Sequence, residues 1–291
     1  MKAEPRFWFA IPVHNRIELT RSCLQSIRKQ VYRNFRIVVC DDGSEDGTAG
    51  ILAADFPEVV VLNGDGNLWW TGATNECVKY ILENAAPDDY LITLNNDLEL
   101  AVNYLGMMAK ALEHKPDAVL ASASYDIAQP DRLVEPGERM DWVRAKVRKL
   151  DPVSYDYSGL AEITHAPGRG TVFPLRVFSS IGLFDFEGLP QYAADYDFTH
   201  RARRAGFRVY MNYDAKLYSH VDHTGSSAFK GGWSLNKFYG YLTSIKSPGC
   251  LKYRWRFARK NCPRLLLPSY IVLDTARVLI SYLLKRRWRM C

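Results

Sequence analysis

Short apolar runs alternate with longer segments of helical periodicity through the first hundred residues. Four of these runs have the length and composition of buried strands: residues 6–13, 35–40, 59–62 and 90–94. Three segments between them repeat apolar side chains at helical spacing: residues 19–30, 48–56 and 74–84. Strands that alternate with helices in this way predict a mainly parallel sheet with helices packed against it.

The chain after residue 100 is less regular. Residues 125–156 are polar, charged and interrupted by prolines, which predicts a long loop region. Residues 177–184 and 193–205 have helical spacing, and residues 207–211 predict one further strand. The sequence has no internal repeat, which excludes solenoids and other repeat architectures.

Three of the predicted strands run directly into polar clusters. The clusters are His14 with Asn15, Asp41 with Asp42, and Asn95 with Asn96 and Asp97. Ligands of open parallel sheets bind at the carboxyl ends of the strands, which is where these clusters fall. Three polar strand ends at one edge therefore favour a ligand site. The alternative is that each cluster only caps the helix that follows it.

Four ordered motifs resemble family 2 glycosyltransferases of the GT-A fold: FAIPVHNR, VVCDDGSEDGT, LNND and ADYDFTHRARRAGF. The similarity extends over residues 6–227, and the stretches GNLWWTGATN, GRGTVFPLRVFSSIGLFD and KSPG are most similar to bacterial members that build surface polysaccharides, rhamnosyltransferase-like ones among them. The resemblance implies a Rossmann-like α/β fold with a mostly parallel central sheet. It also implies inverting transfer of a sugar from a dTDP-, UDP- or GDP-sugar to a hydroxyl of a glycan or lipid-linked acceptor.

We expect the chain to divide into two parts. Residues 1–248 are expected to form one GT-A domain, with a nucleotide-binding half at about 1–100 and an acceptor half at about 101–248. Residues 249–291 are left as a basic, amphipathic helical extension.

The donor site is expected in the nucleotide-binding half. By the resemblance, the second acid of the pair, Asp42, contacts the base, and the backbone at Pro12 and His14 forms the opposite wall. A carboxylate at a strand end can accept hydrogen bonds from a base N–H or from ribose hydroxyls, although a helix cap is the alternative for Asp42. Trp70 is a candidate stacking wall, with core packing as its alternative. The implied donor set is Pro12, His14, Asn15, Asp41, Asp42, Asn67, Trp70, Asn95 and Asn96.

The sequence Asn95-Asn96-Asp97 stands where the family carries its DxD motif. A divalent cation there, Mg²⁺ or Mn²⁺, would neutralise the leaving diphosphate and would be held by hard oxygen ligands. Asn95 replaces the first acid, so Asp97 is the clear ionic ligand. His220 is the second implied metal ligand, and His223 is the weaker candidate of that pair.

Asp195 occupies the position of the family's catalytic base. Inverting transfer needs a carboxylate that takes the proton of the acceptor hydroxyl as its oxygen attacks the anomeric carbon. On a helix, Asp197 points about 200° away from Asp195, so we expect it to orient the backbone or Arg201 rather than to share the base role. Ala194 stands where the family usually has Glu. The residues assigned to acceptor binding are Gly170, Thr171 and Asp197.

Charge is distributed unevenly along the chain. The net charge is +6, yet residues 249–291 carry eleven Lys and Arg against one acid, Asp274. A basic tail on a mildly acidic body indicates an anionic partner, either lipid or nucleic acid. The sequence lacks a nucleic-acid recognition motif, so nucleic acid is not expected as the partner.

The apolar run at residues 265–284 is amphipathic when drawn as a helix. Its polar stripe consists of Asp274, Arg277, Ser281 and Lys285, and its apolar stripe of Val272, Ala276, Leu279 and Leu283. This pattern is typical of a helix that lies at a membrane surface rather than one that spans the bilayer. The alternatives are packing on its own domain or on a second subunit in a homodimer.

Cysteine usage and the N-terminus bear on location. The six cysteines form no CxxC pair, which argues against a zinc site and against a disulfide framework. The first residues lack the apolar core of a secretory signal, so we expect a cytoplasmic protein, peripheral on the inner face of the membrane if the helix binds lipid.

Two other function classes remain as alternatives. A sugar-1-phosphate nucleotidylyltransferase would need a Gly-rich basic loop after the first strand, where this chain has PVHNR. A non-catalytic nucleotide- or glycan-binding protein is kept open by Asn95 and Ala194, the two departures from the family pattern.

Overall fold

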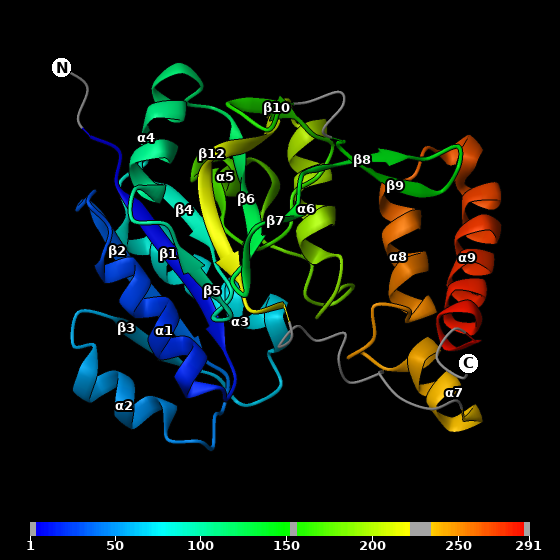
Figure 1. Ribbon diagram of the computed structural model, residues 1–291, viewed down its shortest axis with the longest axis horizontal. Coiled ribbons are helices and arrows are strands. Elements are labelled where there is room, and N and C mark those ends of the chain that lie inside the picture. The colour runs from blue at the N-terminus through cyan, green and yellow to red at the C-terminus, as the bar shows by residue number, and fades with distance from the viewer. Residues whose placement is uncertain (1–3, 152–155, 222–233, 288–291) are drawn as a thin grey trace.

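The computed structural model describes residues 4–151, 156–221 and 234–287, with side chains up to residue 282. The first half contains four strands that alternate with helices: β1 (Phe7–Val13), α1 (Ile17–Arg28), β2 (Phe35–Asp41), α2 (Thr48–Asp55), β3 (Val60–Asn63), α3 (Trp69–Asn84) and β4 (Tyr90–Thr93). The alternation predicted for this half is confirmed (Figure 1).

The second half adds shorter strands to the same sheet. The elements are β5 (Leu98–Leu100), α4 (Tyr104–His114), β6 (Val119–Asp126), β7 (Gln129–Glu135), β8 (Glu138–Asp141), β9 (Lys146–Lys149), β10 (Leu160–Glu162), β11 (Thr171–Pro174), α5 (Arg176–Ile181), α6 (Ala194–Arg204) and β12 (Val209–Ser219). The sheet order is β10-β12-β6-β11-β4-β1-β2-β3. Strands β3, β2, β1 and β4 are parallel, whereas β11 runs antiparallel between β4 and β6. The α/β class is confirmed.

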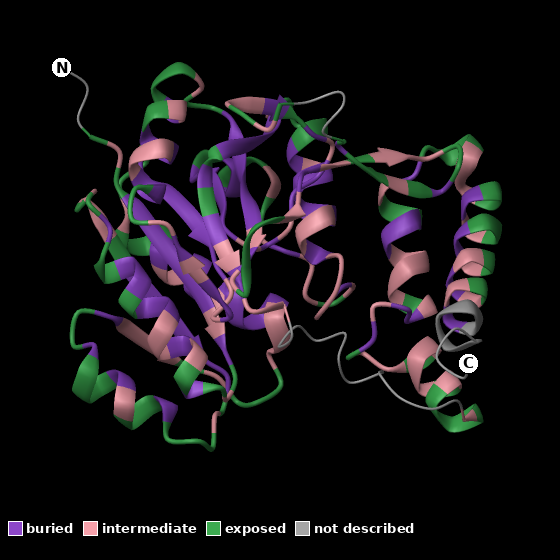
Figure 2. Cartoon of the chain, in the orientation of Figure 1, coloured by how far each residue is buried: buried purple, intermediate pink, exposed green. Residues whose placement is uncertain are grey.

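Strand β1 shows why the central strands are continuously apolar. Phe7, Phe9 and Ile11 face one core, which α1 and α4 cover, while Trp8 and Ala10 face a second core covered by α3, α5 and α6. Successive side chains of a strand point to opposite faces, so a strand with helices on both faces must be apolar at every position. Figure 2 shows the resulting buried interior of the sheet.

The prediction of a long loop at residues 125–156 is wrong over its described part. Strand β7 pairs with β6, and β8 pairs with β9 in a hairpin that forms a separate two-stranded sheet. The first four residues of β7 are exposed, and the hairpin strands hold each other through backbone hydrogen bonds. Neither feature needs an alternating apolar face, so hydrophobic periodicity does not reveal them.

In the described part of the chain after β12, three α-helices follow the sheet: α7 (Leu235–Thr243), α8 (Leu251–Asn261) and α9 (Leu267–Arg287), with a short 3-10 helix, Arg264–Leu266, before α9. Helix α8 packs beside α6, and the β8–β9 hairpin reaches across to α9 (Figure 1). Trp142, in the hairpin turn, connects these parts, because its ring centre lies 5.3 Å from that of His200, 6.1 Å from that of Phe257 and 5.3 Å from that of Tyr270. Helices α8 and α9 are therefore packed against the domain that contains the central sheet.

Two residues of the predicted polar stripe of α9, Asp274 and Arg277, bind the rest of the protein. Asp274 is buried and accepts hydrogen bonds of 2.8 and 2.5 Å from Arg254 of α8. Arg277 donates to the carbonyl oxygens of Arg144 and Ala145 in the hairpin turn. The buried side chains of α9 also include Tyr270, Val278 and Tyr282, whereas Val272 is 67% exposed and Ile280 54%, so apolar side chains lie on both faces of this helix.

Candidate active site

Two cavities adjoin at the carboxyl ends of the central strands. One, of about 410 Å³, is lined by Pro12, His14 and Asp42 from the ends of β1 and β2. The other, of about 470 Å³, contains Asp97 and Asp195. Trp70, Gln191 and Tyr192 line both cavities. The strand-end clusters therefore border a single two-part site, as the parallel sheet predicts.

Asp42 is both a cap and a wall of the first cavity. Its Oδ1 accepts a hydrogen bond from the Gly66 N–H at 2.8 Å, and its Oδ2 accepts one from the Trp69 N–H at 3.0 Å. The ring of His14 is bound through Nδ1 to the Asp42 carbonyl oxygen at 2.6 Å. Each carboxylate oxygen has two lone pairs, so a capping role leaves acceptor capacity for a ligand.

Four residues of the implied donor set stabilise loops and lie outside the walls of the two cavities. Asp41 accepts from the Ser44 N–H, Asn15 accepts from the Glu45 N–H, Asn67 donates to the Asp65 carbonyl oxygen, and Asn96 donates to the Thr20 hydroxyl. Their places favour the capping and turn interpretation of these polar strand ends.

Trp70 separates the two cavities. Its indole Nε1 donates to Asn95 Oδ1 at 2.8 Å, and its backbone N–H donates to Gln191 Oε1 at 3.0 Å. The ring also packs edge-on against Phe184, with centres 5.6 Å apart. The amide oxygen of Asn95 is therefore engaged by Trp70. Trp70 itself packs in the core and also lines the cavity wall.

Asp97 is the acid that remains open at this edge. It is buried, lines the larger cavity, and its Oδ1 has no hydrogen-bond partner among the described residues. His220 lies alongside, because its backbone N–H donates to the Asp97 carbonyl oxygen at 3.1 Å, but its Nε2 contacts Glu99 Oε1 at 3.1 Å. His223 lies outside the described residues.

The single open carboxylate of Asp97 suits a cation that takes most of its ligands from water and from a bound substrate. Among the described residues no group of three or more His, Cys, Asp or Glu side chains is placed to hold a metal ion. Mg²⁺ usually binds through one or two carboxylates, together with waters and substrate phosphates. One carboxylate oxygen without a partner, on the wall of a cavity, fits that mode of binding.

Arg169 is a site residue that the sequence reasoning missed. It lines the larger cavity and donates to Glu135 Oε1 at 2.8 Å and to the Ser219 hydroxyl at 2.6 Å. Burial lowers the pKa of Arg169, but the carboxylates of Glu135 and Asp97 outweigh that effect and raise it. The guanidinium is thus a fixed positive charge close to Asp97.

The glycines on either side of Arg169 are the signal that could have found it. A Cβ on Gly168 would lie 2.2 Å from the ring of Trp70, and a Cβ on Gly170 would lie 2.3 Å from Leu217. Gly170 also has a φ of +74°, a conformation that favours glycine. Two sterically required glycines around one cation indicate a loop that is packed tightly to present that side chain.

Asp195 lies in the first turn of α6 and on the wall of the larger cavity. Its Oδ2 accepts from the Gly168 N–H and its Oδ1 from the Tyr196 N–H, both at 2.8 Å. Burial raises its pKa, and the two backbone hydrogen bonds only partly offset this effect. A carboxylate that is held in place and has a raised pKa is suited to accept a proton.

The residues assigned to acceptor binding do not line either cavity. Asp197 is fully buried and accepts hydrogen bonds from Arg201, Lys260 and Asn261, which confirms the expected pairing with Arg201. Thr171 is buried in β11, where its hydroxyl donates to the Pro167 carbonyl oxygen. Gly170 closes the loop that carries Arg169. These three residues therefore stabilise the segments around the site and do not form its walls.

Comparison with known families agrees with the geometry. A family model described as Glycosyl transferase family 2 matches residues 8–176, which include Asp42, Asp97 and Arg169. The chain belongs to this family. Asp195 and His220 lie beyond the matched range, so their roles depend on the site itself.

Two uncharacterized glycosyltransferases are similar over most of this chain. An uncharacterized glycosyltransferase of Rickettsia prowazekii is 27% identical over 219 residues, covering 72% of this chain and 62% of the relative. A counterpart from Rickettsia typhi is 26% identical over 222 residues, with the same coverage of each chain. The chain thus spans less than two thirds of the length of these relatives.

Solved structures share the fold at low sequence identity. GalNAc-T7, crystallised with UDP, GalNAc and Mn²⁺, superposes with a TM-score of 0.60 at 15% identity, covering 74% of this chain and 43% of that one. Residues 1–349 of TarS from S. aureus superpose with a TM-score of 0.58 at 14% identity, covering 95% and 91%. Both comparisons confirm the GT-A architecture.

Proposed function

We propose that the protein is an inverting glycosyltransferase that moves a hexosyl or deoxyhexosyl group from a nucleotide-diphosphate sugar to a hydroxyl of a glycan or lipid-linked acceptor. The observation that carries the proposal is the two-part site. Asp195 and Asp97 share one cavity, and Trp70, Gln191 and Tyr192 join it to the cavity of Pro12, His14 and Asp42. A nucleotide in the smaller part would direct its diphosphate and sugar toward the two acids.

The proposed chemistry assigns one task to each group. Asp42 and the backbone near Pro12 and His14 bind the base or ribose of a UDP-, dTDP- or GDP-sugar. Asp195 accepts the proton of the acceptor hydroxyl while that oxygen bonds to the anomeric carbon and the bond to the diphosphate breaks. Because attack and departure occur on opposite faces of the sugar, the anomeric configuration inverts.

Charge on the departing diphosphate is to be balanced by Arg169 and by a divalent cation. Asp97, whose Oδ1 has no partner among the described residues, would hold the cation together with the phosphate oxygens. The presence of Mn²⁺ with UDP in the GalNAc-T7 structure supports Mn²⁺ or Mg²⁺ as the ion to test. A bound cation supplies Lewis-acid stabilisation of the leaving group.

Asn95 and Ala194 favour the second candidate, a nucleotide- or glycan-binding protein without catalysis. The amide oxygen of Asn95 is bound to Trp70, so only Asp97 offers an open carboxylate at this strand end. The two candidates agree on nucleotide binding and differ on whether the donor is consumed.

Nucleotide binding tests the first step of the proposal. Isothermal titration calorimetry should detect UDP, dTDP or GDP with the wild type, and Asp42→Ala should weaken that binding about tenfold or more, because a hydrogen-bonded carboxylate is lost. The same variant should also lose roughly 1 kcal/mol of stability, since Asp42 caps the start of α3. Asp65→Ala, at an exposed neighbouring turn, is the matched control. Equal nucleotide affinity in Asp42→Ala would limit Asp42 to its capping role.

The outer face of α9 supports peripheral attachment to the inner face of the cytoplasmic membrane, as expected for surface-polysaccharide synthesis of the rhamnosyltransferase-like type. Arg264–Tyr282 is long and apolar enough to cross a bilayer by length and composition, with a mean hydropathy of 1.3. Asp274 and Arg277 are bound to the rest of the protein, so we propose that this helix lies on the surface. Basic residues near an anionic surface would add about 1 kcal/mol each.

Substitution of the outer face separates membrane binding from folding. Deletion of α9 would expose Trp142 and break the Arg254–Asp274 pair, whereas Val272→Ser combined with Ile280→Ser changes only exposed positions. We expect the double variant to lose co-sedimentation with anionic vesicles at low salt while keeping its melting temperature. Val31→Ser, at another exposed valine, is the control. A wild type that does not co-sediment with anionic vesicles would refute membrane attachment. A dimeric wild type with a monomeric double variant would show that this face binds a second copy of the chain.

A further inference from the structure

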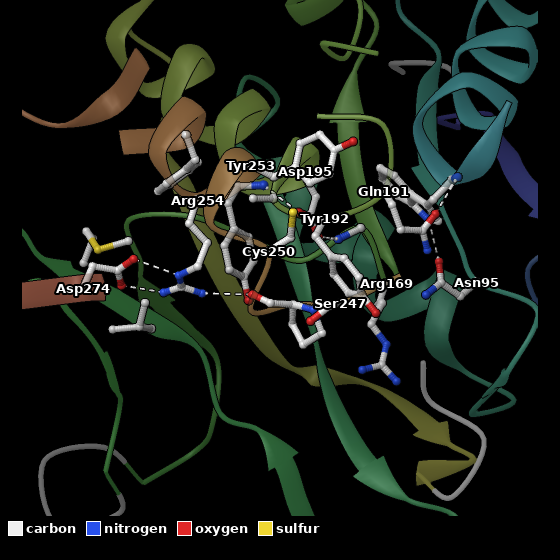
Figure 3. Close-up of a pocket in the computed structure, with 18 of the residues that line it drawn as sticks. Asn95, Arg169, Gln191, Tyr192, Asp195, Ser247, Cys250, Tyr253, Arg254 and Asp274 are labelled. Carbon is white, nitrogen blue, oxygen red and sulfur yellow. Dashed lines mark hydrogen bonds and ion pairs between the residues drawn. The ribbon is translucent and has the colours of Figure 1, made fainter. Parts of the chain in front are cut away.

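The larger cavity extends well beyond the two acids, and its far end is built by parts of the chain outside the sheet. The extension contributes Cys250, Tyr253, Arg254, Phe257, Tyr270 and Asp274. Met140 and Val147 come from the β8–β9 hairpin. Figure 3 shows Asn95 and Arg169 on the right of the cavity and the Arg254–Asp274 pair on the left. One continuous space thus connects the acids to α8 and α9.

The position of Asp195 decides what this far end can hold. An attacking hydroxyl must lie within hydrogen-bond reach of the base. The smaller cavity, where we propose that the nucleotide binds, meets the larger one at Trp70 and Gln191. The rest of the acceptor must then occupy the remaining part of the cavity. Resting on the proposed function, we infer that the C-terminal extension and the β8–β9 hairpin form the acceptor-binding wall, and that a pyranose residue of a glycan binds there.

The chemistry of the lining fits a sugar ring. Tyr192, Tyr196 and Tyr253 line the cavity, and a phenol ring can pack against the polarised C–H groups of a sugar. The hydroxyls of Tyr192 and Tyr196 donate to Lys246 and Glu138 and keep acceptor capacity for a ligand. A lipid chain would call for an apolar end to the cavity. Beside the apolar side chains of Met140, Val147 and Phe257, this end carries Arg254, which donates two hydrogen bonds to the Asp274 carboxylate.

The ion pair is informative because of where it lies. A buried ion pair usually stabilises a fold no better than well-packed apolar side chains of the same volume. Apolar residues could therefore have joined α8 to α9 at this position. Arg254 also donates from Nη1 to the Pro248 carbonyl oxygen, so three hydrogen bonds fix the guanidinium on the cavity wall. Its two remaining N–H groups and the second lone pairs of the Asp274 oxygens are suited to the hydroxyls of a glycan.

The wall is anchored to the helix that carries the base. Asp197, two residues after Asp195, accepts hydrogen bonds from Lys260 at 2.9 Å and from Asn261 at 2.8 Å, both in α8. Trp142 packs between α6, α8 and α9. This arrangement gives Asp197 an indirect part in acceptor binding, because it positions α8 relative to Asp195 without touching the cavity.

Two substitutions on the wall test the inference in the full-length protein. Val147→Trp should fill the cavity from the hairpin, and Val143→Trp, at an exposed position in the turn of the same hairpin, is its control. Tyr253→Ala should remove a ring from the wall, with Tyr239→Ala, at an exposed position of α7, as its control. The probes are a set of methyl pyranosides, detected by saturation-transfer NMR with Mg²⁺ and the nucleoside diphosphate that binds the wild type.

We expect at least one pyranoside to bind the wild type and both controls, and to bind Val147→Trp and Tyr253→Ala about tenfold more weakly or not at all. Nucleotide affinity should be the same in all five proteins. Pyranoside binding that is unchanged in both wall variants would overturn the inference, as would a wild type that binds nucleotide but none of the pyranosides. A wild type that binds no nucleotide would refute the proposed function itself, so the two failures are distinguishable.

Discussion

Asp195→Asn is expected to lower the rate of sugar transfer by about 100- to 10,000-fold, the usual contribution of a general base. The amide keeps the size of the side chain and its acceptor oxygen for the Gly168 N–H, but it cannot take up a proton. Nucleotide affinity should stay near that of the wild type, because Asp195 does not line the donor cavity. Steady-state kinetics together with calorimetry measure both quantities. Transfer within a few-fold of the wild-type rate would show that another group is the base.

The pH profile offers an independent reading of the same group. Burial raises the pKa of Asp195, so the carboxyl stays protonated, and inactive as a base, at a higher pH than an ordinary aspartate would. We therefore expect kcat/KM to fall on the acid side at a pH above the usual aspartate range. Asp88→Asn, which removes an exposed carboxyl away from the site, should change neither the rate nor the pH at which kcat/KM falls on the acid side. An acid limb at the pKa of a solvated aspartate would contradict the assignment.

Asp97→Asn is expected to remove the dependence on divalent cation and to reduce transfer by about 100-fold or more, since stabilisation of a developing charge is commonly worth that much. The variant keeps the shape of the side chain while it removes the carboxylate whose Oδ1 has no partner among the described residues. Titration of Mn²⁺ in the presence of nucleoside diphosphate, followed by electron paramagnetic resonance, measures the lost affinity directly.

The wild type in EDTA is the matching control for this variant. It should fall to a similar residual rate and should recover when Mn²⁺ or Mg²⁺ is returned in excess. Full activity in EDTA would contradict the cation role and would leave Arg169, with its raised pKa, as the main charge opposite the diphosphate.

The strands that could be predicted are those with helices on both faces. Strand β1 alternates between two cores, so every position is apolar and the pattern is visible. Helix α3 begins at Trp69 instead of Thr74, because the Asp42 carboxylate, 27 positions away, accepts the Trp69 N–H. Because this cap comes from a residue that is distant in the sequence, the residues near Trp69 do not indicate that the helix begins there. Strand β12 likewise continues to Ser219, because pairing with β6 resumes at Lys216 after an irregularity.

The site could be predicted where the chemistry belongs to one segment. The motifs identified Asp42, Asp97 and Asp195, and the structure places the first beside one cavity and the other two within the adjoining one. Arg169 was missed because its importance depends on Trp70 and Leu217, which crowd its flanking glycines. The far wall was missed because Arg254 and Asp274 meet across two helices. Such contacts depend on tertiary packing.

Consumption of the donor is the most direct test of the central claim. Wild-type protein would be incubated with UDP-, dTDP- and GDP-sugars, Mg²⁺ and the methyl pyranosides, and the anomeric proton signals would be followed by NMR. The account predicts that at least one donor signal disappears as nucleoside diphosphate and a product of opposite anomeric configuration appear, and that Asp195→Asn suppresses this change. A protein that binds the nucleotide in its cavity yet consumes none of these donors would contradict the account and would instead be a binding protein.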